Sequence, residues 1–220
     1  EIPIMYYNIW DDLPFPHWNE NAYESCDMLM AISQQTYNIN KHVCVRKPRI
    51  EGKDLTYVQH GVDESIYKPL PKDDPGLLEF KKKMLGDAEY DYVAFFNSRN
   101  ILRKHPADLI SAFNTFALSI SKEKRARDSN VIFSTGKLET SQLNYLYNIA
   151  DVMCNPSSAE GFGLSHMEAM MSGTPTIASV LGGLQDQMGF TIKGRPMSIE
   201  DFTIETPSNS TGKISKEHGD

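Results

Sequence analysis

Cysteine is scarce in this chain, which excludes two classes of small, cross-linked protein. The three cysteines, Cys26, Cys44 and Cys154, are far apart, odd in number and lack a Cys-x-x-Cys spacing. They indicate neither a disulfide framework nor a cysteine-based zinc site. Cys154 stands in an apolar run, where we expect a buried free thiol. Because no disulfide is expected, a reducing compartment is the default, and we expect a cytoplasmic protein.

Long apolar runs and concentrated positive charge are missing as well. No stretch approaches the ~20 apolar residues that a membrane span requires, so peripheral contact is the one membrane association left open. The net charge is −7 and no Lys/Arg cluster dominates, which gives no electrostatic footprint for nucleic acid. A small anionic ligand is not excluded, because a local pocket can be cationic in an acidic protein.

The chain does contain an alternation of strand-like and helical segments, which predicts an α/β fold with a parallel sheet covered by helices. The expected strands are residues 4–10, 28–32, 55–58, 92–96, 131–133, 152–154 and 174–178. The expected helices are residues 18–25, 34–42, 77–85, 106–120, 140–149 and 163–172. Ser33 is the expected N-cap of the second helix, and Pro106 suits the first turn of the fourth.

Proline marks the expected domain boundary. The irregular stretch after residue 60 contains Pro69, Pro71 and Pro75, and contacts thin out in such segments. We therefore predict one domain over residues 1–60, a second over residues 61–200 and a polar tail over residues 201–220. The chain opens at Glu1 directly in a strand-like segment, so we expect it to be an excerpt of a longer protein.

Residues 97–106, which follow a predicted strand, form a candidate anion site. Arg99, Arg103 and Lys104 place three cations just before the helix that opens at Pro106. A helix N-terminus offers unpaired N–H groups and about half a positive charge, and a guanidinium can grip two phosphate oxygens at once. The alternative is a solvated basic loop that only neutralises an acidic protein.

Residues 155–164 follow the next strand and suit close approach of a ligand. Gly161 and Gly163 flank an aromatic residue and let backbone N–H groups point outward. Glu168 falls on the apolar stripe of the following helix, where a carboxylate is costly unless it is hydrogen-bonded. Sugar hydroxyls are one candidate partner. The alternative is a glutamate that reaches solvent or pairs with a neighbour.

A third loop, residues 134–138, contains Gly136 between a predicted strand and a helix. Its backbone suits lining a nucleobase, and an ordinary turn is the alternative. All three loops leave the carboxyl ends of strands, where open parallel sheets place their ligands.

The motifs in these loops form a larger pattern. Arg99 and Lys104 have four residues between them, and Glu160 and Glu168 have seven. The segments that continue the pattern are residues 31–33, 60–63, 96–113, 146–152, 156–164, 173–175 and 182–183. This arrangement resembles the retaining GT-B glycosyltransferases of the GT4 family (glycosyl transferases group 1) over most of residues 1–190. The resemblance implies a GT-B-like fold, with a Rossmann-like donor-side domain over residues 61–200 and the end portion of a second, acceptor-side Rossmann-like domain over residues 1–60.

The resemblance also implies roles for the side chains. Arg99 and Lys104 would hold the diphosphate of a nucleotide-sugar donor and stabilise the charge that grows as the nucleoside diphosphate departs. Glu160 would contact the transferred sugar, and Glu168 would bind the ribose hydroxyls. Transfer would proceed with retention to a glycan, lipid or protein acceptor. The donor-binding amides would be those of Gly161, Phe162, Gly163 and Leu164. Gly136 is a further donor-binding candidate, which rests on its own loop and not on the resemblance.

We expect no metal and no other cofactor, because the chain has no Asp-x-Asp motif to bridge a metal to the diphosphate. Asp11 lies about where relatives place a catalytic His or Asp, so it is the second catalytic candidate beside Glu160. A turn-forming Asp pair is the alternative for Asp11.

The chain also departs from the family pattern. Ser98 and His105 stand where glycine is common, and His60 where asparagine is common. Residues 117–130 are too few for the strand and helix that the family usually has there. The glycine-rich first loop of the amino-terminal domain and most of the acceptor site have no counterpart.

Three other functions are alternatives to sugar transfer. A catalytically incomplete nucleotide-sugar-binding module, or a partner subunit, would need the same donor site. An epimerase or phosphorylase on the same fold fits the E-x7-E block with Gly-Phe-Gly less well. A glycosidase that used Glu160 and Glu168 as an acid/base pair is disfavoured, because Glu168 would lie inside a helix.

Overall fold

The computed structural model describes residues 2–12, 14–44, 47–88, 90–120, 130–134, 136–188, 191–192 and 195–196. These residues fall into two compact units, here called the first and second unit. The first comprises Glu1–Gly61, Ser158–Leu164 and the chain from Ser179 onward, and the second comprises Val62–Ser157 and Ser165–Ala178. The predicted domain extents, residues 1–60 and 61–200, remain predictions. The predicted tail, residues 201–220, lies outside the described residues.

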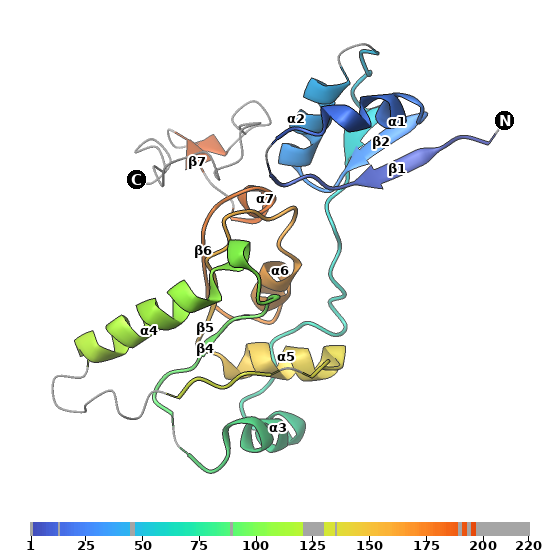
Figure 1. Ribbon diagram of the computed structural model, residues 1–220. Helices are drawn as coiled ribbons and strands as arrows, with labels where there is room; N and C mark the ends of the chain where they lie inside the picture. The colour runs from blue at the N-terminus through green and yellow to red at the C-terminus, as the bar shows by residue number, and fades with distance from the viewer. Residues whose placement is uncertain are drawn as a thin grey trace. The chain divides into compact units, whose positions relative to one another are not determined.

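The first unit is built on a three-stranded parallel sheet of order β1-β2-β3. The strands are β1 (Met5–Asn8), β2 (Met28–Ala31) and β3 (Leu55–Tyr57), paired with Tyr6 opposite Leu29 and Met30 opposite Thr56. The helices α1 (Glu20–Glu24) and α2 (Gln34–Val43) lie beside this sheet (Figure 1). The short 3-10 helix η1 (His17–Asn19) precedes α1.

Side chains from the sheet and its helices make the core of the first unit. Its buried members are Tyr23, Cys26, Leu29, Ala31, Tyr37, Ile39, Val43, Cys44 and Leu55. Ser33 caps α2 as predicted, since its hydroxyl accepts a 3.2 Å hydrogen bond from the Thr36 N–H. Asn8 and Asn40 exchange two buried hydrogen bonds of 2.8 Å, which tie β1 to α2 and satisfy both amides.

The second unit also holds a three-stranded parallel sheet, of order β4-β5-β6. Its strands are β4 (Ala94–Phe95), β5 (Val152–Asn155) and β6 (Thr176–Ala178). Its helices are α3 (Pro75–Leu85), α4 (Pro106–Ile120) and α5 (Thr140–Ile149). A fourth helix, α6 (Leu164–Met171), starts at the last residue of a first-unit segment and continues in the second unit.

Buried aromatic and apolar side chains hold the second unit together. Tyr67, Tyr147, Met153 and Ala169 form one core cluster. Helix α3 packs against α5, with the rings of Phe80 and Tyr145 5.5 Å apart. Cys154 is a buried free thiol, as predicted. In the described part of the chain, we find no helix with the length and apolarity needed to cross a bilayer.

Three further elements follow β6 among the described residues. Helix α7 (Leu184–Gln187) belongs to the first unit. The two-residue strands β7 (Thr191–Ile192) and β8 (Arg195–Pro196) pair antiparallel.

The prediction of a strand at residues 131–133 is wrong. These residues are irregular and at least half-exposed, with Phe133 73% exposed. An isolated extended segment has no neighbour to take its backbone hydrogen bonds, so its apolar composition is not enough to make a strand. The predicted absence of a strand and helix after Phe116 concerns mainly residues 121–129, which lie outside the described residues.

Candidate functional site

The loop between β4 and α4 carries the predicted cations. Arg99 is exposed, whereas Lys104 ends the 3-10 helix η2 (Leu102–Lys104) and is only 7% exposed. Lysine is seldom buried to this degree, because its ammonium group loses hydration that nearby anionic or polar groups must replace. The loop thus presents the guanidinium groups of Arg99 and Arg103 to solvent and encloses the ammonium group of Lys104, directly before the N-terminus of a 15-residue helix.

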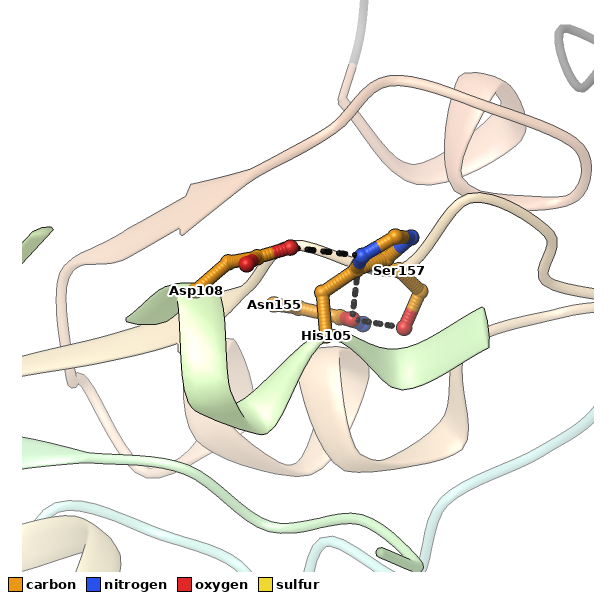
Figure 2. Close-up of polar contacts among 4 residues, drawn as sticks. All are labelled: His105, Asp108, Asn155 and Ser157. Carbon is orange, nitrogen blue, oxygen red and sulfur yellow. Dashed lines mark hydrogen bonds and ion pairs between the residues drawn. The ribbon is translucent and has the colours of Figure 1, made fainter. Parts of the chain in front are cut away.

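His105 turns the chain from η2 into α4. Its backbone is left-handed, with φ 51° and ψ 42°, and it is the single non-glycine residue with positive φ among the described residues. Its carbonyl accepts from the Leu109 N–H at 3.1 Å, so it serves as the first residue of the helical hydrogen-bond pattern. Its imidazole Nδ1 lies 2.9 Å from Oδ2 of Asp108 (Figure 2).

The end of β5 is shaped by Asn155 and Ser157, which are both buried. The Oδ1 of Asn155 accepts hydrogen bonds from the Ser157 N–H and from the Ser157 hydroxyl (Figure 2). This local turn competes with continuation of the strand and redirects the chain. Since β4 and β5 are neighbouring parallel strands, this turn and the cation loop leave the same edge of the sheet.

Glu168 lies on the buried side of α6, as its place on the apolar stripe predicted, and is 8% exposed. Its hydrogen-bond partner is a protein side chain: the Tyr147 hydroxyl donates to Oε2 at 2.7 Å. The Asn97 amide in turn donates to the Tyr147 hydroxyl at 2.9 Å. Asn97 opens the loop that carries Arg99 and Lys104, so a chain of two hydrogen bonds links that loop to the Glu168 carboxylate.

A second tyrosine faces the same carboxylate. Burial first, and then the charge of Glu168 and a hydrogen bond to it, raise the pKa of Tyr67 to about 12. Burial and the Glu168 charge raise the pKa of Tyr147 further above its ordinary value, although the hydrogen bond from Asn97 opposes this shift. Both phenols therefore stay protonated at neutral pH and act as donors to the carboxylate.

In the first unit, the predicted donor loop packs directly against residues 182–183. The Gly183 N–H donates to the Glu160 carbonyl at 2.7 Å. A side-chain carbon at Gly182 would overlap the backbone of Glu160, and one at Gly183 would overlap the backbone of Gly161 and Phe162. The two glycines are therefore needed for this close approach of two backbones. Gln187 also donates to the carbonyls of Phe162 and Gly163.

The other side of this loop meets the segment that precedes Asp11. Gly161 lies against the side chain of Ile9, so a larger residue there would require that side chain to move. The half-buried Asp11 follows Ile9 by two residues and belongs to the same unit as Glu160. The Phe162 ring is buried, with the His60 ring 5.9 Å from it.

Asp186, which sequence reasoning did not single out, lies at the N-terminus of α2 in the first unit. Its Oδ2 accepts from the Gln34 N–H at 3.0 Å and from the Gln59 amide at 3.3 Å. Desolvation raises the pKa of this carboxyl, and the hydrogen bonds from Gln34 and Gln59 oppose the shift without cancelling it.

The structure groups the predicted site residues by unit. Arg99, Lys104, Gly136 and Glu168 belong to the second unit, and Asp11, Glu160, Gly161, Phe162, Gly163 and Leu164 belong to the first. Leu164 and Gly136 are exposed, and no atom lies within 4 Å of where a Gly136 side chain would start. Tyr147, Asn97 and Gly183 are additional site residues. The signal for Tyr147 is its place in residues 146–152 of the family pattern, but the sequence analysis assigns it no role of its own.

Comparison with known proteins gives a consistent result. Residues 118–194 match the family described as Glycosyl transferases group 1. The MMP alpha-(1->4)-mannosyltransferase of Mycolicibacterium hassiacum is 41% identical over 61 residues, which are 28% of this chain and 15% of that protein. The D-inositol 3-phosphate glycosyltransferase of Corynebacterium glutamicum is 52% identical over 44 residues, 20% of this chain and 10% of that protein.

The likeness extends to solved structures. HepE of Anabaena, crystallised with UDP-glucose, superposes with a TM-score of 0.63 at 20% identity. The match covers 88% of this chain and 57% of HepE, so this chain spans little more than half of that protein. These findings confirm the resemblance seen in the sequence motifs. Over residues 118–194 the chain is similar to the glycosyl transferases group 1 family, and its fold is GT-B-like.

Proposed function

We propose that this chain is the donor-binding part of a glycosyltransferase that moves a sugar from a nucleotide-diphosphate sugar to a glycan, lipid or protein acceptor. The observation that carries the proposal is the hydrogen-bond chain from Asn97 through Tyr147 to Glu168. It joins a loop of cations to a buried carboxylate at the edge of a parallel sheet where ligands bind. A nucleoside diphosphate needs both groups, the cations for its phosphates and the carboxylate for its ribose.

The cation loop suits the diphosphate. Arg99 is exposed and can reach two phosphate oxygens, and Lys104 adds an enclosed positive charge. Helix α4 begins at Pro106, so its N-terminal N–H groups and dipole favour the same anion. Charges positioned in this way stabilise the negative charge that develops on a departing nucleoside diphosphate.

The glycine loop suits the sugar. In our proposal Glu160 contacts the transferred sugar, and the amides of residues 161–164 bind sugar and phosphate. The Gly182–Gly183 pair supports this role, because it holds the Glu160 carbonyl and the loop backbone in one arrangement. Asp11 is the second catalytic candidate. The HepE complexes with UDP-glucose and UDP support a nucleotide sugar as the donor class.

We further propose that transfer proceeds with retention and without a metal ion. Retention rests on the likeness to the group 1 glycosyltransferases. Metal independence rests on the cations themselves: the sequence has no Asp-x-Asp motif, and Arg99, Lys104 and the N-terminus of α4 supply positive charge at the diphosphate.

A panel of nucleotide sugars tests the donor site. The melting temperature of the protein is measured with UDP-, GDP- and ADP-sugars, for wild type, Arg99→Ala and Glu168→Ala. A donor at 100 times its Kd stabilises the folded state by about 2.7 kcal/mol, and both variants should lose most of that stabilisation. Arg103→Ala is the matched control, because it removes one positive charge from the same loop at a residue with no proposed donor contact.

The proposal fails if no nucleotide sugar raises the melting temperature of the wild type, or if the two variants respond as wild type does. A second candidate is a nucleotide-sugar-binding module or partner subunit without turnover, which would need the same donor site. Such a module would give the same melting shifts, but it would release no free sugar or glycoside from the donor during prolonged incubation.

A further inference from the structure

Tyr147 is enclosed by the core of the second unit at the centre of the Glu168 contacts. Its side chain is 0% exposed, and its ring packs edge-on against Phe95 with centroids 5.4 Å apart. The Tyr67 ring lies 6.1 Å away on another side. The Thr174 hydroxyl donates to its backbone carbonyl at 2.7 Å. The contacts with Phe95 and Tyr67 hold the Tyr147 ring, and the hydrogen bond from Thr174 holds its backbone. The position of the Tyr147 phenolic oxygen is therefore fixed by the fold.

The hydrogen bonds of this hydroxyl have a defined direction. A phenol has one proton to donate. The Asn97 amide can only donate through its Nδ2, which makes the Tyr147 oxygen the acceptor in that contact. The single phenolic proton is therefore committed to Glu168 Oε2, at 2.7 Å. Asn97 therefore donates to Tyr147, and Tyr147 donates to Glu168. The hydrogen bond from Asn97 orients the Tyr147 hydroxyl, and the hydroxyl in turn orients the Glu168 carboxylate.

We propose that Tyr147, oriented by Asn97, is a positioning residue that holds the Glu168 carboxylate in the orientation that binds the donor ribose. This inference rests on the proposed function and goes beyond it by assigning a role to two residues outside the donor-contacting set. Ribose presents two neighbouring hydroxyls, and a carboxylate meets them well only when its plane is fixed. A buried carboxylate without such a donor would also be expensive to keep ionised.

The phenylalanine variant separates positioning from packing. Tyr147→Phe keeps the ring and its contacts with Phe95 and Tyr67 but removes the hydroxyl. Tyr145→Phe is the matched control: it lies on the same helix, and its ring packs against Phe80, away from Glu168. Asn97→Ala is a second test that leaves the buried ring untouched. Melting temperatures of all three variants establish that they fold.

The readout is the discrimination between ribose and 2′-deoxyribose, measured by calorimetric titration. The probes are the nucleoside diphosphate among UDP, GDP and ADP that binds wild type most tightly, and its 2′-deoxy counterpart. Removing a hydrogen bond to a charged group should weaken the ribonucleotide about tenfold in Tyr147→Phe, and the deoxynucleotide by about twofold or less. Asn97→Ala should shift the ribonucleotide in the same direction by about threefold. Tyr145→Phe should bind both probes as wild type does.

The outcomes separate this inference from the function on which it rests. A wild type that binds none of the nucleotides overturns both. A wild type that binds, with discrimination unchanged in Tyr147→Phe, overturns the positioning role alone. An equal weakening of both probes also overturns it, because a general disturbance of the fold does not distinguish the 2′-hydroxyl. Should Tyr147→Phe fail to fold, the discrimination ratio of Asn97→Ala decides the question in the same way.

Discussion

The His105 imidazole contacts the Asp108 carboxylate at 2.9 Å while its own backbone is left-handed. Glycine is common at this position in the family that the sequence resembles, because a side chain makes positive φ unfavourable by about 1 kcal/mol. Asp108 lies in the first turn of α4, where the helix dipole also favours its negative charge. The contact with Asp108 offsets part of the backbone cost of having histidine here.

Replacement of His105 tests this account of the backbone. His105→Gly should be more stable than His105→Ala by about 1 kcal/mol, since glycine adopts positive φ without a steric cost and alanine loses the Asp108 contact without relieving the strain. The free energy of unfolding is measured by urea denaturation. An alanine variant as stable as the glycine variant would contradict a left-handed residue 105.

Gly183 tests the close approach of two backbones in the first unit. Gly183→Ala should lower the free energy of unfolding by at least about 2 kcal/mol, because the new methyl group meets backbone atoms of Gly161 and Phe162 that cannot move aside easily. Gly61→Ala is the control, since no atom lies within 4 Å of that position. Equal effects of the two substitutions would argue against the packed loop.

In the proposed donor site, Glu160 contacts the sugar, whereas Arg99, Lys104 and Glu168 contact the nucleotide. Replacement of Glu160 tests this division of roles. Glu160→Gln should weaken a bound nucleotide sugar about tenfold, through loss of a charge-assisted hydrogen bond, and leave the matching nucleoside diphosphate within about twofold. Titration calorimetry of both ligands gives the two ratios. If Glu160→Gln weakened the binding of both ligands equally, Glu160 would not be a residue that contacts the sugar.

Asp186 should make stability depend on pH in a defined direction. Desolvation raises its pKa above the ordinary 3.8, so the folded protein holds this proton more tightly than the unfolded chain does. Its contribution is therefore most favourable below the unfolded value and is lost as pH rises through the raised folded value. Above that range, the ionised carboxylate opposes folding.

Asp186→Asn isolates this contribution, because the amide oxygen can still accept from the Gln34 N–H. The variant should melt above wild type at pH 7, and the difference should shrink as the pH is lowered toward 3.8. Melting curves of both proteins across this pH range provide the measurement. A difference that is constant with pH, or negative at pH 7, would show that desolvation of Asp186 is not the dominant effect.

The buried thiols predict slow chemical modification. Burial raises the pKa of Cys44 and of Cys154, which lowers the fraction of reactive thiolate and also blocks access. Ellman's reagent at pH 8 should label neither cysteine in the folded protein within minutes, and all three cysteines of the chain after denaturation in guanidinium. Rapid labelling of the native protein at Cys44 or Cys154 would contradict their burial.

Much of the fold was predictable from local pattern. Helical period placed α5 at residues 140–149, and Ser33 marked the start of α2. The same period put Glu168 on a buried stripe, and the spacing of Arg99 and Lys104 before Pro106 placed two cations at a helix start. Each of these features depends on residues within one or two helical turns of each other. Local interactions such as helix capping and side-chain periodicity therefore suffice to predict them.

Tertiary structure decided which segments pair as strands and which side chains hydrogen-bond to Glu168. Residues 131–133 have strand composition but pair with no strand in the described part of the chain, and they are irregular. Glu168 takes its hydrogen bond from Tyr147, 21 residues away, and Tyr147 takes one from Asn97, 50 residues away. A periodic pattern tells which side of a helix is buried, but the atom that meets it there is set by how distant segments pack. The sequence alone thus placed Glu168 on an apolar stripe, where a carboxylate is costly without a hydrogen bond, and only the folded chain determined that a tyrosine supplies that bond.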